Sequence, residues 1–358
     1  MPNRALVLSG GGSKGAFEVG AVDYLVNESG LDFQVITGVS SGSLNSVILA
    51  QGHGHAGLKR QIEVLKALWF GIRSRDDVLL GKFLGKLLVL LTAQSLYSPE
   101  PLMAKLRAAI SFDRLRSSGK ELRVGAVSLE SGNYRAIDQN DPDLLQWVLA
   151  SSSIPVAFPP VKIGGESAVD GGVRNVTPLE DAFRALSALN PDPSDETDEI
   201  YIVLASPLEA ELAMGPWKTG LQIGARSVSI LVNEIYREDI SYALAVNEGV
   251  RFYNQLHSTL GRWMGEPAAT TVLESLEESH PFRFKPPRYR YVTIRAIVPD
   301  QEYSDALEFD PAKIRAAYKA GRDAARDPWE EFELAKLLNG EVNPTKEQVP
   351  GPEFAEVG

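Results

Sequence analysis

The sequence contains no cysteine at all and only four histidines among its 358 residues. The absence of cysteine excludes disulfide bonds, thiolate catalysis and cysteine-ligated zinc sites. No stretch reaches the roughly 18–20 consecutive apolar residues that a membrane-spanning helix needs. The apolar run after Arg4 is also too short for the core of a signal peptide. We therefore expect a cytoplasmic protein whose contact with a membrane surface is peripheral.

Basic residues are scarce as well. The chain has 36 Lys and Arg against 47 Asp and Glu, which gives a formal net charge of -11. A general nucleic-acid-binding protein needs a basic face, so we expect no nucleic-acid partner. The acidic run at residues 190–199 is typical of a solvated loop, and no metal-ligand pattern stands out. We expect neither a metal nor a cofactor.

Short apolar runs alternate along the chain with segments of helical periodicity. The patterns predict strands at 5–8, 34–39, 121–129, 133–138, 167–170, 200–205 and 290–298, and helices at 15–27, 42–51, 57–71, 99–110, 143–152, 175–186, 220–257 and 310–326, the last being the final helix. This alternation predicts an α/β fold, a three-layer α/β/α sandwich with a mostly parallel central sheet. We expect residues 1–335 to form a single domain. The Pro-, Glu- and Gly-rich residues 340–358 should form a disordered tail.

The first predicted strand leads into a glycine loop, Ser9-Gly10-Gly11-Gly12-Ser13-Lys14-Gly15. Small residues let backbone N–H groups approach an anion, and the following helix N-terminus adds positive potential. The anion could be a dinucleotide pyrophosphate, because Gly10, Gly12 and Gly15 satisfy G-x-G-x-x-G and Asp32 stands near the distance of a ribose-binding acid. It could equally be the oxyanion of a tetrahedral acyl intermediate. A turn without any ligand is the third interpretation.

The second motif, Gly38-Val39-Ser40-Ser41-Gly42, matches the G-x-S-x-G nucleophile elbow. It stands between a predicted strand and a predicted helix, as such an elbow requires. Ser40 is therefore the candidate nucleophile, and the Ser41 N–H is a candidate oxyanion donor. The competing interpretation of Ser40 is an ordinary helix N-cap.

A serine nucleophile needs a proton acceptor. None of the four histidines, at positions 53, 55, 257 and 280, lies in a turn that looks catalytic. Asp170 follows an apolar step and precedes Gly171-Gly172, a turn that can direct its carboxylate inward. A buried carboxylate can serve as the sole base, so we predict a Ser40–Asp170 dyad. An ordinary Asp-Gly turn is the alternative.

These motifs, together with Ala150-Ser151-Ser152-Ser153-Ile154-Pro155, occur in an order that resembles the patatin-like phospholipases. The resemblance covers residues 5–180 and implies a single patatin-like catalytic domain over 1–335. It implies that Ser40 is the nucleophile and Asp170 the base. It places the oxyanion hole at Gly10, Gly11, Gly12 and Ser41, with Lys14 supporting the loop. The implied substrates are phospholipids, lysophospholipids or neutral lipids. Ser9 departs from the Asp of many members, and Lys14 from their Arg.

Two other functions stay open on the sequence. One is a dinucleotide-binding oxidoreductase that uses the Gly10-Gly12-Gly15 loop. The other is a non-catalytic lipid-binding protein of the same fold. A variant of the hydrolase reaction is acyl transfer to another alcohol in place of water.

Residues 79–91 place their leucines at helical spacing, with Lys82 and Lys86 on another face. Such a segment can lie in a membrane interface. We expect residues 79–110 to form a cap or lid at the mouth of the site; a buried helix is the alternative. Residues 261–265, around Trp263, form a second candidate for interfacial contact.

Overall fold

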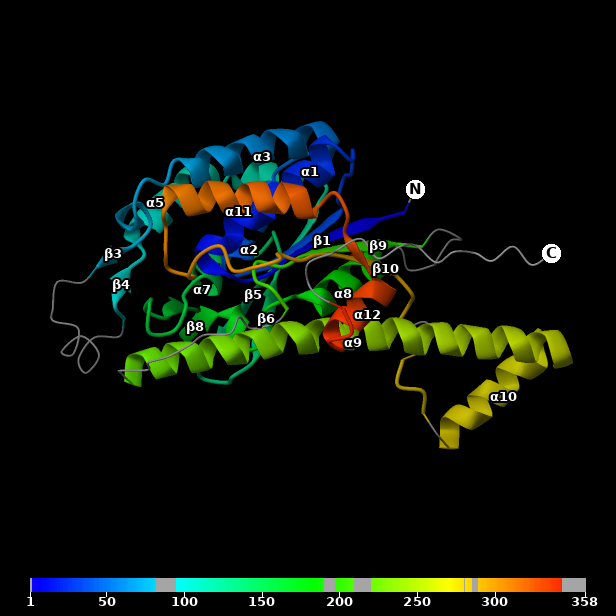
Figure 1. Cartoon of the computed structure of the whole chain (residues 1–358). Coiled ribbons are helices and arrows are strands. Elements are labelled where there is room, and N and C mark those ends of the chain that lie inside the picture. Colours follow the sequence, from blue (N-terminus) through cyan, green and yellow to red (C-terminus); the bar gives the residue numbers. More distant parts are fainter. Residues whose placement is uncertain are drawn as a thin grey trace.

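The computed structural model describes residues 2–81, 95–189, 197–208, 220–279, 281–284 and 289–342. Within these residues, nine strands form one large sheet between two layers of helices (Figure 1). Its five central strands are parallel to one another and follow the order β10 (Thr293–Ile297), β9 (Glu199–Val203), β1 (Arg4–Leu8), β2 (Val35–Val39) and β5 (Glu121–Ser128). The predicted three-layer α/β/α sandwich is confirmed.

Both margins of the sheet are antiparallel. On one side β11 (Trp329–Glu330) pairs with β10. On the other side β5 pairs with both β6 (Tyr134–Ile137) and β8 (Glu166–Asp170), and β7 (Val161–Ile163) pairs with β8. The strands predicted at 121–129 and 133–138 correspond to β5 and β6, which the turn at residues 130–132 joins into an antiparallel hairpin.

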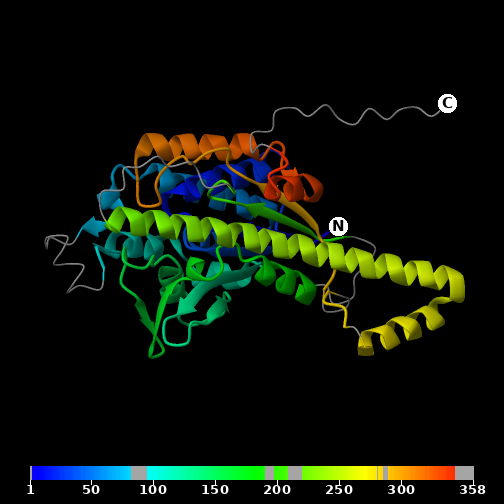
Figure 2. The same ribbon diagram turned by 60° about the horizontal axis from the view of Figure 1, so that its bottom comes forward.

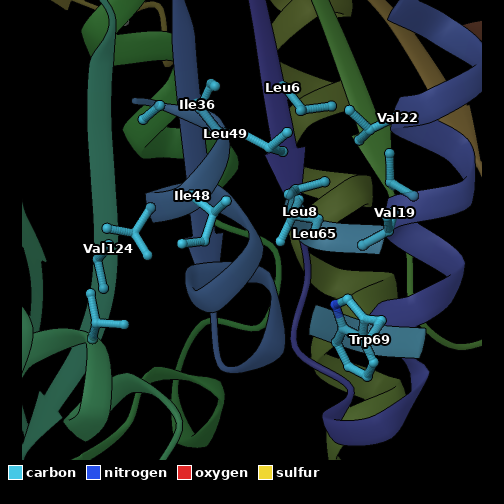
Figure 3. Close-up of a cluster of buried hydrophobic side chains, with 14 of the residues drawn as sticks. Leu6, Leu8, Val19, Val22, Ile36, Ile48, Leu49, Leu65, Trp69 and Val124 are labelled. Atoms are coloured by element: carbon cyan, nitrogen blue, oxygen red, sulfur yellow. The ribbon is translucent and has the colours of Figure 1, made fainter. Parts of the chain in front are cut away.

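The two faces of the sheet carry separate cores, because side chains alternate along each strand. In β1, Leu6 and Leu8 face one core and Ala5 and Val7 face the other. The first core is covered by α1 (Gly15–Asn27), α2 (Ser41–Leu49), α3 (Gly54–Phe70), α7 (Leu144–Ser151) and α11 (Pro311–Ala324). Figure 3 shows part of it, where Leu8 lies between side chains of these helices such as Val19, Ile48 and Leu65.

The second core lies under α8 (Leu179–Leu189), α9 (Gly220–Met264) and α12 (Glu331–Leu338). Figures 1 and 2 show α9 as one long rod whose later part leaves the body of the molecule. There α10 (Glu266–Ser279) folds back along it as a helical hairpin. Despite its length α9 is not apolar enough to cross a bilayer, and neither is any other helix in the described ranges.

The region expected to form a lid is described only in part. Val78 and Leu79 are buried, and β3 (Leu80–Gly81) pairs antiparallel with β4 (Tyr97–Ser98). Then follow α5 (Glu100–Ala109) and α6 (Phe112–Ser117). From residue 82 onward the amphipathic segment 79–91 lies outside the described residues, as does the tail from residue 343.

Candidate active site

The strand register brings the ends of β2 and β8 together. Val39, the last residue of β2, pairs with Gly125 of β5, while Asp170, the last residue of β8, pairs with Ala126. Because β2 runs parallel to β5 and β8 runs antiparallel to it, the carboxyl ends of the two strands approach each other. Ser40 and Asp170, 130 positions apart in the numbering, thus meet above two adjacent residues of one strand.

Ser40 occupies a strained turn between β2 and α2. Its backbone has φ 56° and ψ -126°, a conformation that costs a non-glycine residue about 1–3 kcal/mol and is found mainly at functional sites. Ser40 stands at the N-cap position of α2, but its hydroxyl caps no helix amide. The N-cap interpretation therefore does not explain the serine. A side chain at Gly42 would overlap the carbonyl oxygens of Leu8 and Ser9, which explains the second glycine of the motif.

Asp170 is almost completely buried, with 4% of its surface exposed. Its Oδ1 accepts a hydrogen bond of 2.8 Å from the Gly172 N–H, as in an ordinary Asp-Gly turn. Burial raises the pKa of the Asp170 carboxyl from 3.8 to about 7, although the Gly172 N–H and the Ser40 hydroxyl both act to lower it. The carboxylate therefore does more than close a turn: it interacts with the Ser40 hydroxyl and has the pKa of an effective base near neutral pH.

The serine-rich segment at the end of α7 holds both residues in place. The Ser40 N–H donates to Ser151 Oγ at 3.0 Å, and the Asp170 N–H donates to the Ser153 carbonyl at 3.1 Å. The block Ala150–Pro155 is thus a clamp on the two backbones. The resemblance identified this block in the sequence, but only the structure shows what it contacts.

The glycine loop runs beside Ser40. A Cβ atom on Gly10 would lie 3.0 Å from Ser40 Cβ. The Gly10 N–H donates to the Val176 carbonyl at 3.2 Å, so it is already engaged. By contrast, the N–H groups of Gly11, Gly12 and Ser41 find no acceptor among the described residues. These three amides are therefore the best candidates for oxyanion donors.

Residues beyond position 200 anchor this loop. The Lys14 ammonium binds Ser206 Oγ at 2.9 Å and Glu302 Oε2 at 2.7 Å, so it holds the loop to the segments that follow β9 and β10. The Tyr236 hydroxyl of α9 donates to the Gly10 carbonyl, and the Ser13 N–H donates to the Ala306 carbonyl at 2.8 Å. Nothing in the sequence pattern pointed to Tyr236, whose partner lies 226 positions away.

An apolar pocket of about 100 Å³ opens directly at Ser40. Gly12, Ser40 and Ser41 line it, as do the polar side chains of Asn45, Lys105 and Ser152. The rest of the wall comes mainly from aliphatic and aromatic side chains of α2, α3, α5 and the 306–309 loop, among them Leu44, Ile48, Leu65, Leu68, Trp69, Ile72, Leu79, Leu102, Leu106, Phe158, Leu307 and Phe309. Such a pocket suits a hydrocarbon chain.

The other candidate residues lie elsewhere. Asp32 precedes β2, whose first residue Val35 pairs with Ala5 near the start of β1, whereas the glycine loop follows the end of β1. Asp32 is thus at the opposite end of the sheet, in an ion pair of 2.7 Å with Lys120, and cannot bind a ribose at the loop. His53 and His55 contact the carbonyl oxygens of Ser118 and Val26. In the described part of the chain, no group of three or more His, Asp or Glu side chains could hold a metal ion.

Several solved structures are similar to this chain at low sequence identity. VipD from Legionella pneumophila is 12% identical with a TM-score of 0.39, over 95% of this chain and 67% of VipD. The type III effector ExoU of Pseudomonas aeruginosa is 15% identical with a TM-score of 0.37, over 94% of this chain and 54% of ExoU. Human GIVD cytosolic phospholipase A2, in complex with methyl gamma-linolenyl fluorophosphonate, is 10% identical with a TM-score of 0.35, over 95% of this chain and 60% of that chain. Likeness at this level adds no argument about activity.

In sequence, no curated protein matches this chain. The family model for patatin-like phospholipase matches residues 6–183, a range that contains the glycine loop, the serine elbow, the serine-rich clamp and Asp170. Through this match, residues 6–183 of the chain are identified as a patatin-like phospholipase domain.

Proposed function

We propose that this protein is a lipid acyl hydrolase that cleaves carboxylic esters of phospholipids or lysophospholipids through a Ser40–Asp170 dyad. The match to this family supports lipid hydrolysis as the general activity. One observation carries the mechanism. Ser40 has a strained backbone, and its hydroxyl caps no helix amide. It lies between the buried Asp170 carboxyl, whose pKa is raised to about 7, and an apolar pocket.

In the proposed reaction, the Asp170 carboxylate accepts the hydroxyl proton of Ser40 as Oγ attacks the ester carbonyl carbon. The amides of Gly11, Gly12 and Ser41 donate hydrogen bonds to the oxyanion that forms. The carbon–oxygen bond to the alcohol then breaks, and the alcohol leaves with the proton from Asp170. Water attacks the acyl-enzyme in the second half, with Asp170 again as base, and Ser40 regains its proton.

The apolar lining of the pocket supports the proposal that the acyl group transferred to Ser40 is a fatty acyl chain. Each methylene removed from water contributes about 0.8 kcal/mol, so a wall of leucine, isoleucine and aromatic side chains favours long chains. Because Ser40 lines this pocket, an acyl chain bound in it would bring its ester carbonyl to the Ser40 hydroxyl. The head group would then lie outside the pocket.

Labelling with a fluorophosphonate tests the proposal, because this reagent modifies activated serines. We expect the wild type to be labelled and to release fatty acid from phosphatidylcholine vesicles, and Ser40→Ala to do neither. Ser46→Ala is the matched control: Ser46 lies on the same helix and is buried, and its hydroxyl has no hydrogen-bond partner in the described part of the chain, so labelling should persist.

Equal labelling of Ser40→Ala and wild type would assign the activity to another residue. If the wild type binds vesicles but is neither labelled nor hydrolytic, with and without detergent, a non-catalytic lipid-binding protein becomes the better explanation. Release of an acylated alcohol in place of free fatty acid would indicate acyl transfer.

A further inference from the structure

A buried glutamate that takes no part in the proposed steps lies beneath the glycine loop. Glu18, in the first turn of α1, has none of its surface exposed. Its Oε2 accepts a hydrogen bond of 2.8 Å from Asn45 Nδ2, and Asn45 is itself 1% exposed. Burying an acidic side chain away from water costs free energy unless the carboxyl is hydrogen-bonded or paired.

Asn45 has all of its strong hydrogen-bonding groups engaged. Its Nδ2 donates to Glu18 and also to the Gly15 carbonyl at 3.0 Å, while its Oδ1 accepts from Trp69 Nε1 at 2.9 Å. These three bonds fix the orientation of the amide. Both Asn45 and Trp69 line the apolar pocket, so this buried network reaches the wall of the candidate acyl site.

The network joins the two parts of the site that must cooperate. Asn45 lies five positions after Ser40 on the helix that follows the serine elbow. Gly15 closes the glycine loop and begins α1. Fixing Asn45 against Gly15 therefore fixes the loop amides relative to the nucleophile. Oxyanion stabilisation depends steeply on this geometry, since donors must reach the oxygen at about 2.7–3.1 Å.

The chemistry of Glu18 suits such a role. Burial raises the pKa of the Glu18 carboxyl well above its usual range, although the Asn45 amide and the Ser9 backbone act to lower it. This shift favours the uncharged acid. An uncharged acid accepts the Asn45 hydrogen bond without placing a negative charge under an oxyanion that is about to form.

We infer that Glu18 is a positioning residue, which sets through Asn45 the spacing between Ser40 and the oxyanion-hole amides. This inference rests on the proposed function, because it assumes that Ser40 attacks an ester. It predicts that loss of the Glu18 side chain slows acyl-enzyme formation without weakening substrate binding.

The test compares Glu18→Leu, Glu18→Asp and Glu18→Gln with the wild type. The readouts are kcat and KM on a short p-nitrophenyl ester, the rate of fluorophosphonate labelling, and the melting temperature. Leucine removes the acceptor, and aspartate withdraws it by one methylene. In both we expect kcat and the labelling rate to fall about tenfold to a hundredfold with KM nearly unchanged. Glutamine keeps an uncharged acceptor and should restore both rates.

Asp23→Asn provides the matched control. Asp23 is also a buried acid of α1, but it binds Tyr318 and Arg322 of α11, away from the loop. This variant should lose thermal stability and keep its kcat. A similar loss of kcat in Asp23→Asn at equal loss of stability would mean that Glu18 is merely structural.

Wild-type rates in Glu18→Leu would overturn the inference, and so would a Glu18→Gln variant as slow as the leucine variant. If Glu18→Leu does not fold, wild-type rates in Glu18→Asp overturn it equally. Ser40→Ala is measured in parallel. Undiminished hydrolysis by Ser40→Ala refutes the proposed function itself, whereas inactive Ser40→Ala beside fully active Glu18 variants refutes only the role of Glu18.

Discussion

Replacing Asp170 by asparagine should abolish hydrolysis and at the same time stabilise the fold above neutral pH. Burial raises the pKa of Asp170 from 3.8 to about 7, so between these values the folded protein holds a proton that the unfolded chain has released. The stability that this proton contributes is fully present below pH 3.8 and is lost as the pH rises through 7. Asparagine keeps an oxygen that can accept from Gly172 but has no charge to bury.

The size of the effect follows from the shift in pKa. The shift is close to three units, and each unit corresponds to about 1.36 kcal/mol of free energy. The upper limit on the gain of Asp170→Asn is therefore about 4 kcal/mol at pH 8. It should decline to roughly 1.5 kcal/mol at pH 5 and vanish below about pH 4.

Thermal and denaturant unfolding of the wild type and Asp170→Asn at pH 5 and pH 8 measure this difference. Asp76→Asn, at an exposed position, controls for the loss of one carboxylate and should show no such trend. The reasoning is refuted if Asp170→Asn is equally stabilised at both pH values, or if it is less stable than the wild type at pH 8.

Four further outcomes are expected. The kcat/KM of the wild type should rise between pH 5 and pH 8 with a midpoint near 7, because only ionised Asp170 accepts a proton; a flat profile would exclude it as the base. Ser151→Ala removes the acceptor of the Ser40 N–H, and steady-state kinetics should show kcat lower by about tenfold with KM unchanged. Leu106→Trp narrows the pocket, so across a series of p-nitrophenyl esters it should reduce hydrolysis of long chains more than of butyrate. Gly12→Ala puts a side chain on a backbone with φ 62° and against the Ala306 carbonyl. Melting curves should show that the free energy of unfolding falls by about 1–3 kcal/mol. An unchanged melting temperature would contradict the loop geometry.

The sequence predicted the elements around the site well, because each has a strong local signal. The strands at 5–8 and 34–39 are apolar runs that end in glycine motifs, and they match β1 and β2 within one residue. The helix predicted at 310–326 is α11, and Asp310 caps it by accepting hydrogen bonds from the N–H groups of Ala312 and Lys313. The prediction that this helix is the last one was wrong, since α12 follows it.

Elements with weak local signals were missed. β7 and β11 have only three and two residues, too few to show alternation, so these two edge strands were not predicted. The end of α9 was placed too early, at residue 257, whereas the helix continues to Met264 and ends before Gly265, whose φ is 86°. The helix α10, and with it the hairpin, was not predicted.

The site itself was predictable in its residues but not in its connections. Ser40 and Asp170 stand in recognisable motifs, yet their juxtaposition depends on the register of β2 and β8 against β5. The engagement of the Gly10 amide by Val176 likewise follows from contacts that are distant in sequence. Glu18 and Asn45 have no motif at all, because their importance lies in mutual contact within the fold.

The long helix α9 affects the hydrodynamic behaviour of the protein. Its 45 residues span about 68 Å at 1.5 Å per residue. A compact chain of this length would have a radius of gyration of about 21 Å, equivalent to a sphere roughly 53 Å across. Because the hairpin of α9 and α10 projects from the body (Figure 2), the monomer should experience more friction than a globular protein of 39.0 kDa. On a gel-filtration column a monomer would elute early and could be mistaken for a dimer, whereas light scattering, which reports mass independently of shape, would distinguish the two.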